Sequence, residues 1–416
     1  MSVNFLKKIW SFPRAKSQRA YHVVDDFLNL PVFFCKAMGI EPFESDRKSG
    51  IWFYVYFVLN SFNTMVVFVT GLVFLVIAFQ DGEHFLEGCI VMSYVIFMFV
   101  GILKLITVLI KKQKLTRLVR QLESCFPSPS ASDQELYDVK SYLKRCNIIT
   151  RGYGRFLTLM AISHSLTPMV IYFFQSCVLH LPDAKQSLPY YDMAPWNWRG
   201  SWSFYPAYLF QLIAGYTVTC GAISSDAMIF AVAFQVLMHY DRLAKALREF
   251  QIRNNNQSDG ANEDLKALQS LIAYHIDILR LTDLMNEVFG VPLLLNFMAS
   301  SVLVCLVGFQ LTFILSDYYF FKQVLFLVAG LVEIYLLCSF SQMLINASED
   351  VSTAAYDMSW TEADTRCRKM LIILLMRAQK PVCLKATIVL DLSMETMSIF
   401  LGTSYKFFCA IKTMYE

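Results

Sequence analysis

The sequence predicts an all-helical membrane protein that crosses the bilayer seven times. Three observations carry this prediction: seven long apolar runs, few charges within them, and connections that alternate between basic and non-basic. Hydrophobic residues make up 56% of the 416 residues and charged residues only 17%, against about 25% charged in an ordinary soluble domain. A spanning helix needs about 20 mostly apolar residues, and each of the seven runs meets that length.

The runs are interrupted by few charges. In chain order the predicted spans are residues 51–79, 85–110, 156–181, 202–238, 288–315, 318–345 and 388–411. A charge inside the bilayer is costly without a partner or water, so we expect Asp226 and Glu333 to be partnered, in the cytosolic half of the bundle. The last run is the least apolar of the seven, since it contains three charged side chains.

Lys and Arg in the connections set the orientation. The segment before the first span is basic, as are the connections after spans two, four and six, whereas those after spans one, three and five hold few Lys or Arg. The prediction is therefore a cytosolic N-terminus and an extracellular C-terminus. The two glycosylation sequons, at Asn256 and Asn346, fall on the cytosolic side and are expected to be unmodified.

Helices are predicted to continue beyond the membrane on the cytosolic side. Residues 115–126 and 134–149 extend spans two and three, span four continues to about residue 250, and residues 264–286 lead into span five. These extensions predict a helical cytosolic layer rather than simple loops.

Three other segments have distinct expected roles. Residues 27–38 are apolar but too short to span, which predicts an interfacial segment. Residues 253–262, rich in Asn, Gln, Ser and Gly, are expected to be flexible. Residues 181–200 contain three prolines with Trp196 and Trp198, and we expect this loop to form an ordered lid.

Several function classes lack their sequence signatures. No H-E-x-x-H, G-x-S-x-G or acidic metal cluster occurs and the six histidines are dispersed, so no enzyme, metal or cofactor is expected. His164 is expected to be a hydrogen-bonded interior residue. No basic stripe with interleaved aromatics suggests nucleic acid. The inward N-terminus, and the lack of an Asp-Arg-Tyr-like triplet or an N-P-x-x-Y, argue against a G-protein-coupled receptor, and no internal repeat suggests a transporter.

The C-terminal quarter carries a specific pattern. Its elements are Ala354-Ala355-Tyr356, Trp360, Met376-Arg377-Ala378-Gln379-Lys380-Pro381, Leu392-Ser393-Met394-Glu395-Thr396 and Ser404-Tyr405-Lys406-Phe407-Phe408. In order and spacing this pattern resembles the C-terminal region of insect odorant receptors. The chain lacks the long insertion between spans four and five of the family's shared co-receptor, and the Gln-Phe ending of the related gustatory receptors. It therefore resembles an odorant-specific, tuning subunit.

The resemblance implies a mechanism and a partner. Members of this family are ligand-gated, non-selective cation channels in which four subunits surround a central pore lined by the last helix. A tuning subunit forms a heterotetramer with the co-receptor in the plasma membrane of an olfactory sensory neuron, surrounded by membrane lipid. In this chain, residues 1–346 would hold six spans and an outer-half ligand pocket, and residues 347–416 a cytosolic anchor helix and the pore-lining helix.

The resemblance also implies residues for the anchor and the pore. The subunit-anchor residues would be Tyr356, Trp360, Leu371, Leu374, Leu375 and Pro381. The alternative for this basic, amphipathic segment is that it lies on the membrane surface. The pore residues would be Lys406, Ala410, Thr413 and Met414. Lys406 either faces the conduit, where a ring of lysines would repel cations, or pairs with a buried carboxylate such as Glu333.

In the family the ligand lies in the outer half of one subunit, between spans two, three, four and six. The corresponding residues here are Cys89, Met92, Ser93, Pro168, Met169, Tyr172, Phe173, Ser176, Phe204, Tyr208, Gln211, Leu212, Phe320, Val324 and Leu327. This aromatic and apolar set suits a small, volatile, hydrophobic odorant; ordinary helix packing is the alternative for each. A gustatory-type receptor of the same fold, a G-protein-coupled receptor and a transporter remain the rival functions.

Overall fold

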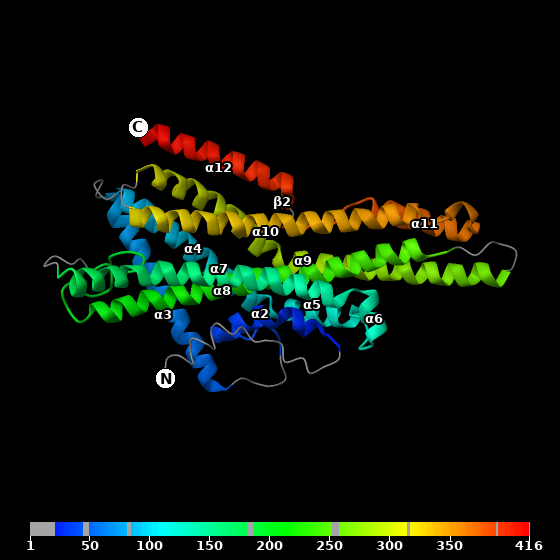
Figure 1. Ribbon diagram of the computed structural model, residues 1–416, viewed down its shortest axis with the longest axis horizontal. Coiled ribbons are helices and arrows are strands. Elements are labelled where there is room, and N and C mark those ends of the chain that lie inside the picture. Colours follow the sequence, from blue (N-terminus) through cyan, green and yellow to red (C-terminus); the bar gives the residue numbers. More distant parts are fainter. Residues whose placement is uncertain are drawn as a thin grey trace.

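The structure, a computed structural model, describes residues 21–44, 50–80, 85–180, 186–251, 258–313, 317–387 and 390–415, and it is mostly helical (Figure 1). Within these residues, six helices are long and apolar enough to cross a membrane. They are α3 (Ile51–Gln80), α4 (Phe85–Ile110), α7 (Val139–Phe173) with the π-helix η2 (Phe174–Val178), α8 (Phe204–Glu249), α9 (Ser258–Phe313) and α10 (Asp317–Tyr356). The shorter elements are α2 (Val24–Ala37), α5 (Lys112–Cys125), α6 (Ala131–Leu136), η3 (Trp360–Glu362), α11 (Thr365–Ala378), β1 (Lys385–Ala386), β2 (Leu390–Asp391) and α12 (Met394–Tyr415).

Helix α8 is the axis of the fold. It packs against α2, α3, α4, α7, α9 and α10, and residues 217–240 are all buried. This stretch is rich in Ala, Gly and Ser, which let neighbouring helices approach closely. A Cβ on Gly101 of α4 would lie 2.5 Å from Val218 Cγ1, and one on Gly221 would lie 2.9 Å from a Leu105 methyl carbon. Glycine at these two positions therefore sets the close spacing of α4 and α8.

The last helix begins later than the sequence predicts. The predicted span starts at residue 388, but β1 and β2 form a two-stranded antiparallel pair there, so Asp391 lies outside the helix. Helix α12 starts at Met394 because Ser393 caps it: the Ser393 hydroxyl accepts a hydrogen bond from the Thr396 N–H at 3.1 Å. Helix α12 is not among the six helices that are long and apolar enough to cross a membrane, which agrees with the low apolarity of the last run in the sequence.

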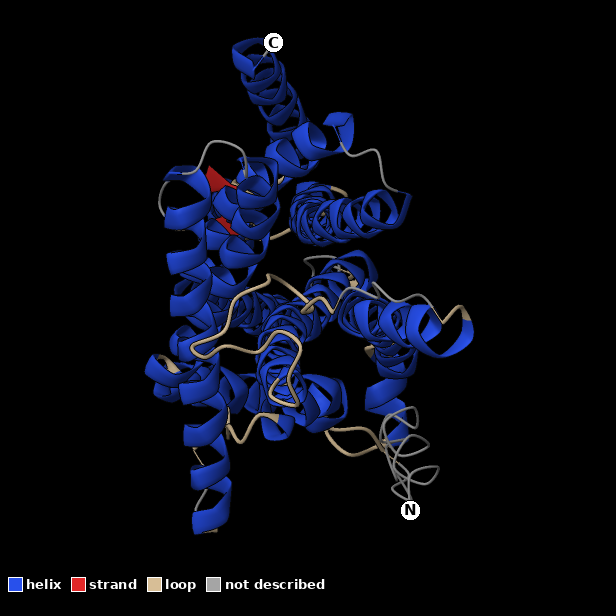
Figure 2. Ribbon diagram, turned by 90° about the vertical axis from the view of Figure 1, so that its left-hand side faces the viewer, coloured by secondary structure: helices blue, strands red, loops and turns tan. Residues whose placement is uncertain are grey.

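The shorter helices lie at different places along the long ones. Figure 1 shows α11 at one end with α5 and α6 in the same half of the molecule, and the loop that enters α8 at the other end, where the C-terminus also lies. Helix α12 packs against α9 and α10, and the helix that ends at the C-terminus projects from the bundle in the second view (Figure 2). The C-terminal end and the basic connections are therefore at opposite ends of the molecule.

Several predicted connections differ in detail. Residues 112–125 form a separate helix rather than an extension of span two, and Asp138, with a left-handed φ of 48°, separates α6 from α7. Helix α2, predicted as interfacial, packs against α8 and buries Phe27, Leu28 and Phe34. Of the segment predicted to be flexible, residues 253–257 lie outside the described residues, and residues 258–262 form the first residues of α9.

Candidate functional site

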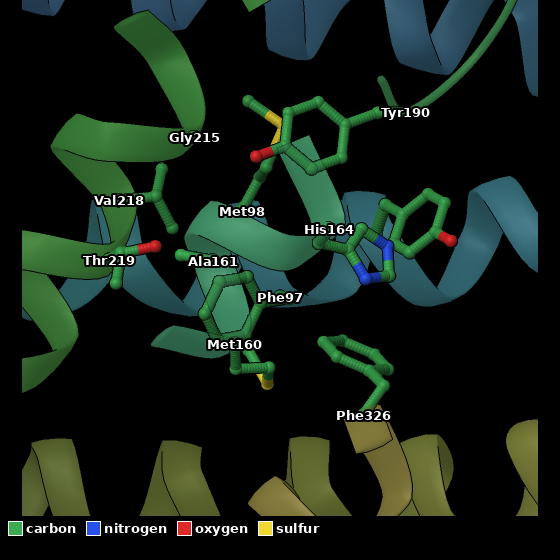
Figure 3. A pocket seen from close by; sticks show the side chains of 11 residues that line it. Phe97, Met98, Met160, Ala161, His164, Tyr190, Gly215, Val218, Thr219 and Phe326 are labelled. Atoms are coloured by element: carbon green, nitrogen blue, oxygen red, sulfur yellow. The ribbon is translucent and has the colours of Figure 1, made fainter. Parts of the chain in front are cut away.

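A small cavity, lined mostly by buried side chains, lies between α4, α7, α8 and α10. Its volume is about 30 Å³. Figure 3 shows most of its side chains. The lining residues are Tyr94, Phe97, Met98, Met160, Ala161, His164, Tyr190, Gly215, Val218, Thr219 and Phe326. The wall is thus aromatic and apolar with few polar atoms, which is the usual lining of a small-molecule site.

Four rings form an aromatic group at this cavity. The Tyr94 ring centroid lies 5.0 Å from that of His164, 5.7 Å from Tyr190 and 5.9 Å from Phe326, each near-perpendicular. The rings of His164 and Tyr190 are stacked, with centroids 6.1 Å apart. Offset and edge-to-face contacts are the favoured ring geometries, so the four side chains form one packed unit that a ligand would have to rearrange.

Tyr190 comes from a loop, not from a helix. Gln211 on α8 holds the loop in place, because its side chain accepts from the Tyr190 N–H at 3.0 Å and donates to the Tyr191 carbonyl at 2.9 Å. The Tyr190 hydroxyl hydrogen-bonds with Ser165 at 3.0 Å. A Cβ on Gly215 would lie 1.8 Å from that hydroxyl oxygen. Only glycine at residue 215 therefore lets Tyr190 fill this part of the cavity.

The rest of the loop is also fixed to the bundle. The Tyr191 hydroxyl bonds with Thr70 at 2.7 Å, and Trp198 is buried. The Asp192 carboxylate accepts the Leu188 N–H at 2.8 Å, and burial raises the pKa of this carboxyl above its usual value, more than the Leu188 hydrogen bond lowers it. In its described residues, the loop is ordered and covers the end of the bundle, as predicted.

His164 contributes the main unpaired polar atom of the cavity. The side chain is buried, and no described residue gives Nε2 a hydrogen-bond partner. The expected interior position is therefore correct, but the expected hydrogen bond is missing at this nitrogen. A buried polar atom without a partner costs roughly 1–3 kcal/mol, so a ligand able to hydrogen-bond Nε2 would recover that cost.

A second cavity continues the first towards the middle of the helices. It is also about 30 Å³, and its walls include Phe97, Met160 and Phe326, which line the first cavity too. Its far side is formed by α9 and α10, and reaches Glu333. The two cavities are therefore adjacent and share part of their walls.

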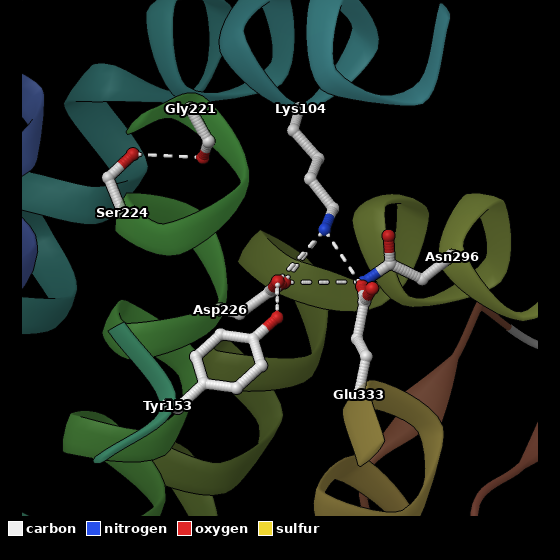
Figure 4. A network of polar contacts seen from close by, with 7 residues as sticks. All are labelled: Lys104, Tyr153, Gly221, Ser224, Asp226, Asn296 and Glu333. Atoms are coloured by element: carbon white, nitrogen blue, oxygen red, sulfur yellow. Dashed lines mark hydrogen bonds and ion pairs between the residues drawn. The ribbon is translucent and has the colours of Figure 1, made fainter. Parts of the chain in front are cut away.

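A buried ionic cluster lies at the far side of the second cavity, where Glu333 is part of the wall. Lys104 Nζ lies 3.0 Å from both carboxylate oxygens of Asp226 and 2.9 Å from Glu333 Oε1. Tyr153 and Asn296 donate to Asp226 at 2.8 and 3.3 Å. Figure 4 shows these side chains converging from α4, α7, α8, α9 and α10. One cation thus joins two carboxylates at the point where five helices meet.

This cluster answers two sequence expectations. Asp226 and Glu333 have partners, as expected, but the partner of Glu333 is Lys104 rather than Lys406. Lys406 is exposed on α12. The suggested pairing between Lys406 and Glu333 is therefore wrong.

The residues predicted for the ligand pocket lie on the four helices that line the cavity, but mostly about one to two helical turns nearer the outer end. Leu327 lines the second cavity and Leu212 lines a larger crevice described below. Phe204 and Tyr208 are buried against the loop, with Met169 packed beside them, and Tyr172 contacts Phe204.

Other members of the predicted set have structural contacts or face outwards. Gln310 of α9 donates to the Cys89 carbonyl and to the Ser93 hydroxyl. Phe173 and Phe320 are exposed. Pro168 is buried within an uninterrupted helix, and Met92, Ser176 and Val324 are half-buried. Ligand contact for the whole set stays a prediction.

The lining that sequence reasoning missed includes Tyr190, which comes from the loop. His164 and the loop residues Trp196 and Trp198 were visible as isolated features in the sequence, but nothing local linked His164 to Tyr190 across the bundle. The contact arises from the tertiary fold, because the two residues belong to different elements.

Three of the four predicted pore residues are exposed on α12. Lys406, Ala410 and Thr413 are exposed, and the side chain of Met414 lies outside the described residues. The opposite side of the helix packs on α9, where Cys305 Sγ donates to the Ser404 carbonyl at 3.1 Å.

The predicted anchor is partly covered by the chain itself. Leu371 and Leu374 are buried in the main core, and Leu375 packs against it. Exposed apolar side chains remain on the other face of α11 and beside it. They are Ile372, Ile373 and Met376, with Tyr356 and Trp360; Pro381 is exposed as well.

Comparisons with known proteins agree with one another. Residues 85–405 match the family model described as 7tm Odorant receptor. The chain is 60% identical to Odorant receptor 67a of Drosophila melanogaster over 399 residues, which covers 96% of this chain and 98% of that protein. It is 36% identical to Odorant receptor 85c of the same fly, covering 94% and 99%. The structure of the insect olfactory receptor OR5 from Machilis hrabei in complex with eugenol matches with a TM-score of 0.78 at 16% identity, covering 94% of this chain and 100% of that one; at this identity the match shows a shared fold.

Proposed function

Because the chain belongs to the insect odorant receptor family, we propose that it is the odorant-binding subunit of a ligand-gated, non-selective cation channel. The family consists of receptors and channels, so the chain is not an enzyme. Membership favours an odorant receptor over the gustatory, G-protein-coupled and transporter alternatives. The observation that carries the proposal is the aromatic cavity between α4, α7, α8 and α10.

The proposed topology has seven crossings, with α12 as the seventh, in the plasma membrane of an olfactory neuron. Six apolar helices and the separation of the basic connections from the C-terminal end support this arrangement. The N-terminus would be cytosolic and the C-terminus extracellular.

The proposed ligand is a small hydrophobic odorant. Ligand pockets usually measure about 300–1,000 Å³, so a cavity of about 30 Å³ must enlarge to hold one. The Tyr190 side chain is the natural moving part, since it belongs to a loop residue and its hydroxyl makes one hydrogen bond, to Ser165. Once Tyr190 moves, His164 Nε2 would offer a hydrogen bond to the ligand.

Helix α9 is the proposed connection between ligand and pore. Its Gln310 hydrogen-bonds to Cys89 and Ser93 on α4, and its Cys305 bonds to Ser404 on α12. Gln310 and Cys305 lie about one to two helical turns apart on α9. A ligand that shifts α4 relative to α9 would therefore also shift the contact between α9 and α12. A ligand needs only differential affinity for the open state to shift this equilibrium.

The proposed partner is the family's co-receptor, in a heterotetramer. The uncovered side of α12, with Lys406, Ala410 and Thr413, would line the pore, and Met414 stays a predicted pore residue. Exposed Ile373 and Met376 on α11, at 64% and 66%, would contact a neighbouring subunit, since large apolar side chains gathered on a surface mark association sites.

The test is whole-cell current during odorant application, with the chain expressed alone and with the co-receptor, and with G-protein signalling blocked. We expect a rapid cation current only with the co-receptor, and the current should survive the block. His164→Phe keeps a ring but removes the nitrogen, and should weaken sensitivity to odorants that carry a hydrogen-bonding group.

Tyr190→Ala removes the ring that fills the cavity and should change the half-maximal odorant concentration about tenfold, which is about 1.4 kcal/mol. The matched control is Tyr205→Ala, an exposed tyrosine outside the cavity, which should behave as wild type. Equal odorant sensitivity in all three variants would place the ligand elsewhere, and a current abolished by the G-protein block would refute the channel.

A further inference from the structure

A larger crevice opens on the outside of the bundle beside the cavity. It lies between α2, α3, α7 and α8, and its volume is about 510 Å³. Most of the surface that its lining exposes is apolar, although several hydroxyl side chains belong to it, and at its mouth Ile162 and Leu166 are 41% and 45% exposed. In a bilayer, side chains exposed on this surface face the hydrocarbon of the lipids.

Only a thin wall separates the crevice from the cavity. Ala161 and Thr219 line both spaces, and Figure 3 shows them side by side at the edge of the cavity. Ser165, which lines the crevice, hydrogen-bonds to Tyr190, which lines the cavity. The wall therefore consists of small side chains and one hydrogen bond.

The opposite approach, from the extracellular end, is covered. Gln211 bonds to the backbone of Tyr190 and Tyr191, and Trp198 of the same loop is buried. An odorant coming from water would have to disrupt these contacts before it reached the cavity. An odorant already dissolved in the bilayer meets only the apolar crevice.

We propose that this crevice is the access route by which odorants pass from the lipid bilayer into the cavity, between α7 and α8 and past Ala161 and Thr219. The inference rests on the proposed odorant-binding function and adds the route to it. The crevice is bounded by α2, α3, α7 and α8. Helix α12 packs on α9 and α10, on the other side of the molecule (Figure 1). The route thus opens away from the proposed pore.

The chemistry of the crevice selects a small apolar occupant. The hydroxyls of Tyr56 and Tyr216 both donate to the Ala37 carbonyl, at 3.1 and 3.2 Å, so these polar groups are engaged and close the crevice at α2. No charged side chain belongs to the described lining, so a phospholipid headgroup would find no ionic partner there. A small hydrophobic molecule needs none.

An access route has a kinetic signature that a binding site lacks. Narrowing the mouth raises the barrier for entry and exit equally, because the same path is used in both directions. The equilibrium between bound and free odorant depends only on the end states. A substitution at the mouth should therefore slow activation and washout by the same factor and leave the half-maximal concentration unchanged.

The experiment compares Leu166→Trp with Leu159→Trp in complexes with the co-receptor, using rapid odorant steps. Both leucines lie on α7, seven residues apart and so on nearly the same face, and they are 45% and 47% exposed, but only Leu166 lines the crevice. Leu166→Trp should slow both time courses several-fold, and Leu159→Trp should not. Leu166→Ala widens the mouth and should speed both, which keeps the test decisive if the tryptophan variant does not reach the surface.

Each outcome bears on one claim. Time courses of Leu166→Trp and Leu166→Ala equal to those of Leu159→Trp would overturn the route. A changed half-maximal concentration with unchanged time courses would also overturn it, and would make the crevice a site for a bound lipid tail. If Tyr190→Ala still shifts the half-maximal concentration in those same recordings, the proposed function stands and only the route fails; an absent odorant current in the wild-type complex would remove both.

Discussion

Replacing Lys104 by methionine tests what holds the middle of the bundle together. Lys104 is 2% exposed and is the cation between Asp226 and Glu333. Methionine has a similar length and volume but no charge, so the packing of α4 against α8 is largely retained. The variant leaves two buried carboxylates without their counter-ion.

The size of the effect follows from this burial. Removing one partner of a buried ion pair costs about 3–5 kcal/mol. With an unfolding entropy of about 2.1 cal/mol/K per residue over 416 residues, the midpoint of thermal unfolding should fall by about 3–6 °C. Tyr153 and Asn296 still donate to Asp226, so a loss at the upper end of this range is not expected.

The assay is the thermal midpoint of the purified protein in lipid nanodiscs, followed by tryptophan fluorescence. The control is Lys114→Met: Lys114 pairs with Glu287, but both side chains are about half exposed, at 51% and 54%. Surface ion pairs contribute roughly 0–1 kcal/mol, so the control should lie within about 1 °C of wild type by the same conversion.

A rescue variant separates charge from packing. Lys104→Met combined with Asp226→Asn and Glu333→Gln leaves no buried charge and should recover most of the lost stability, because the desolvation cost disappears with the charges. Two results would refute the reasoning: a midpoint of Lys104→Met equal to that of Lys114→Met, or a triple variant less stable than the single one.

Three further changes give separate tests. Gly101→Ala brings a Cβ to 2.5 Å from Val218 Cγ1, so α4 and α8 must move apart and the thermal midpoint should fall by the equivalent of about 1–3 kcal/mol; no change would mean that the spacing is not set there. Because burial raises the pKa of Asp192, its contribution to stability increases as pH falls through that raised pKa. Asp192→Asn should therefore have a thermal midpoint equal to or above that of wild type at pH 7, and its midpoint should not gain the increase that the wild type shows as pH falls. A midpoint clearly below wild type at pH 7 would contradict the expected destabilising effect of the buried carboxylate. Ile373 is 64% exposed on α11, so Ile373→Asp should change the free energy of unfolding of the isolated chain by no more than about 0.5 kcal/mol. The same substitution should reduce co-purification with the co-receptor. Undiminished co-purification would exclude α11 as the contact.

The sequence predicts the helices better than it predicts the cavity. The apolar run at residues 85–110 coincides with α4, and the predicted end of span four near residue 250 coincides with the end of α8 at Glu249. Helix length and apolarity are local properties, since each bilayer-crossing helix satisfies its own backbone hydrogen bonds. The start of α12 is missed because the Ser393 cap and the short strand pair override an apolar run that continues past them.

The cavity depends on properties that are not local. The four lining helices follow from the family resemblance, but the residues that face one another depend on the rotation and depth of each helix. A helix turns through about 100° per residue, so a small error in rotation replaces one set of side chains by another. The predicted set accordingly lies about one to two turns from the side chains that line the cavity.

The sequence by itself determined the class of this protein: an apolar, helical membrane chain whose C-terminal motif belongs to the odorant receptors. Only the tertiary structure decided that Lys104 joins Asp226 to Glu333, that Tyr190 enters the bundle against Gly215, and that Ala161 and Thr219 separate a small cavity from a larger crevice. The physical reason is that helix formation is set by neighbours in the chain, whereas these contacts are made between helices, by side chains far apart in sequence.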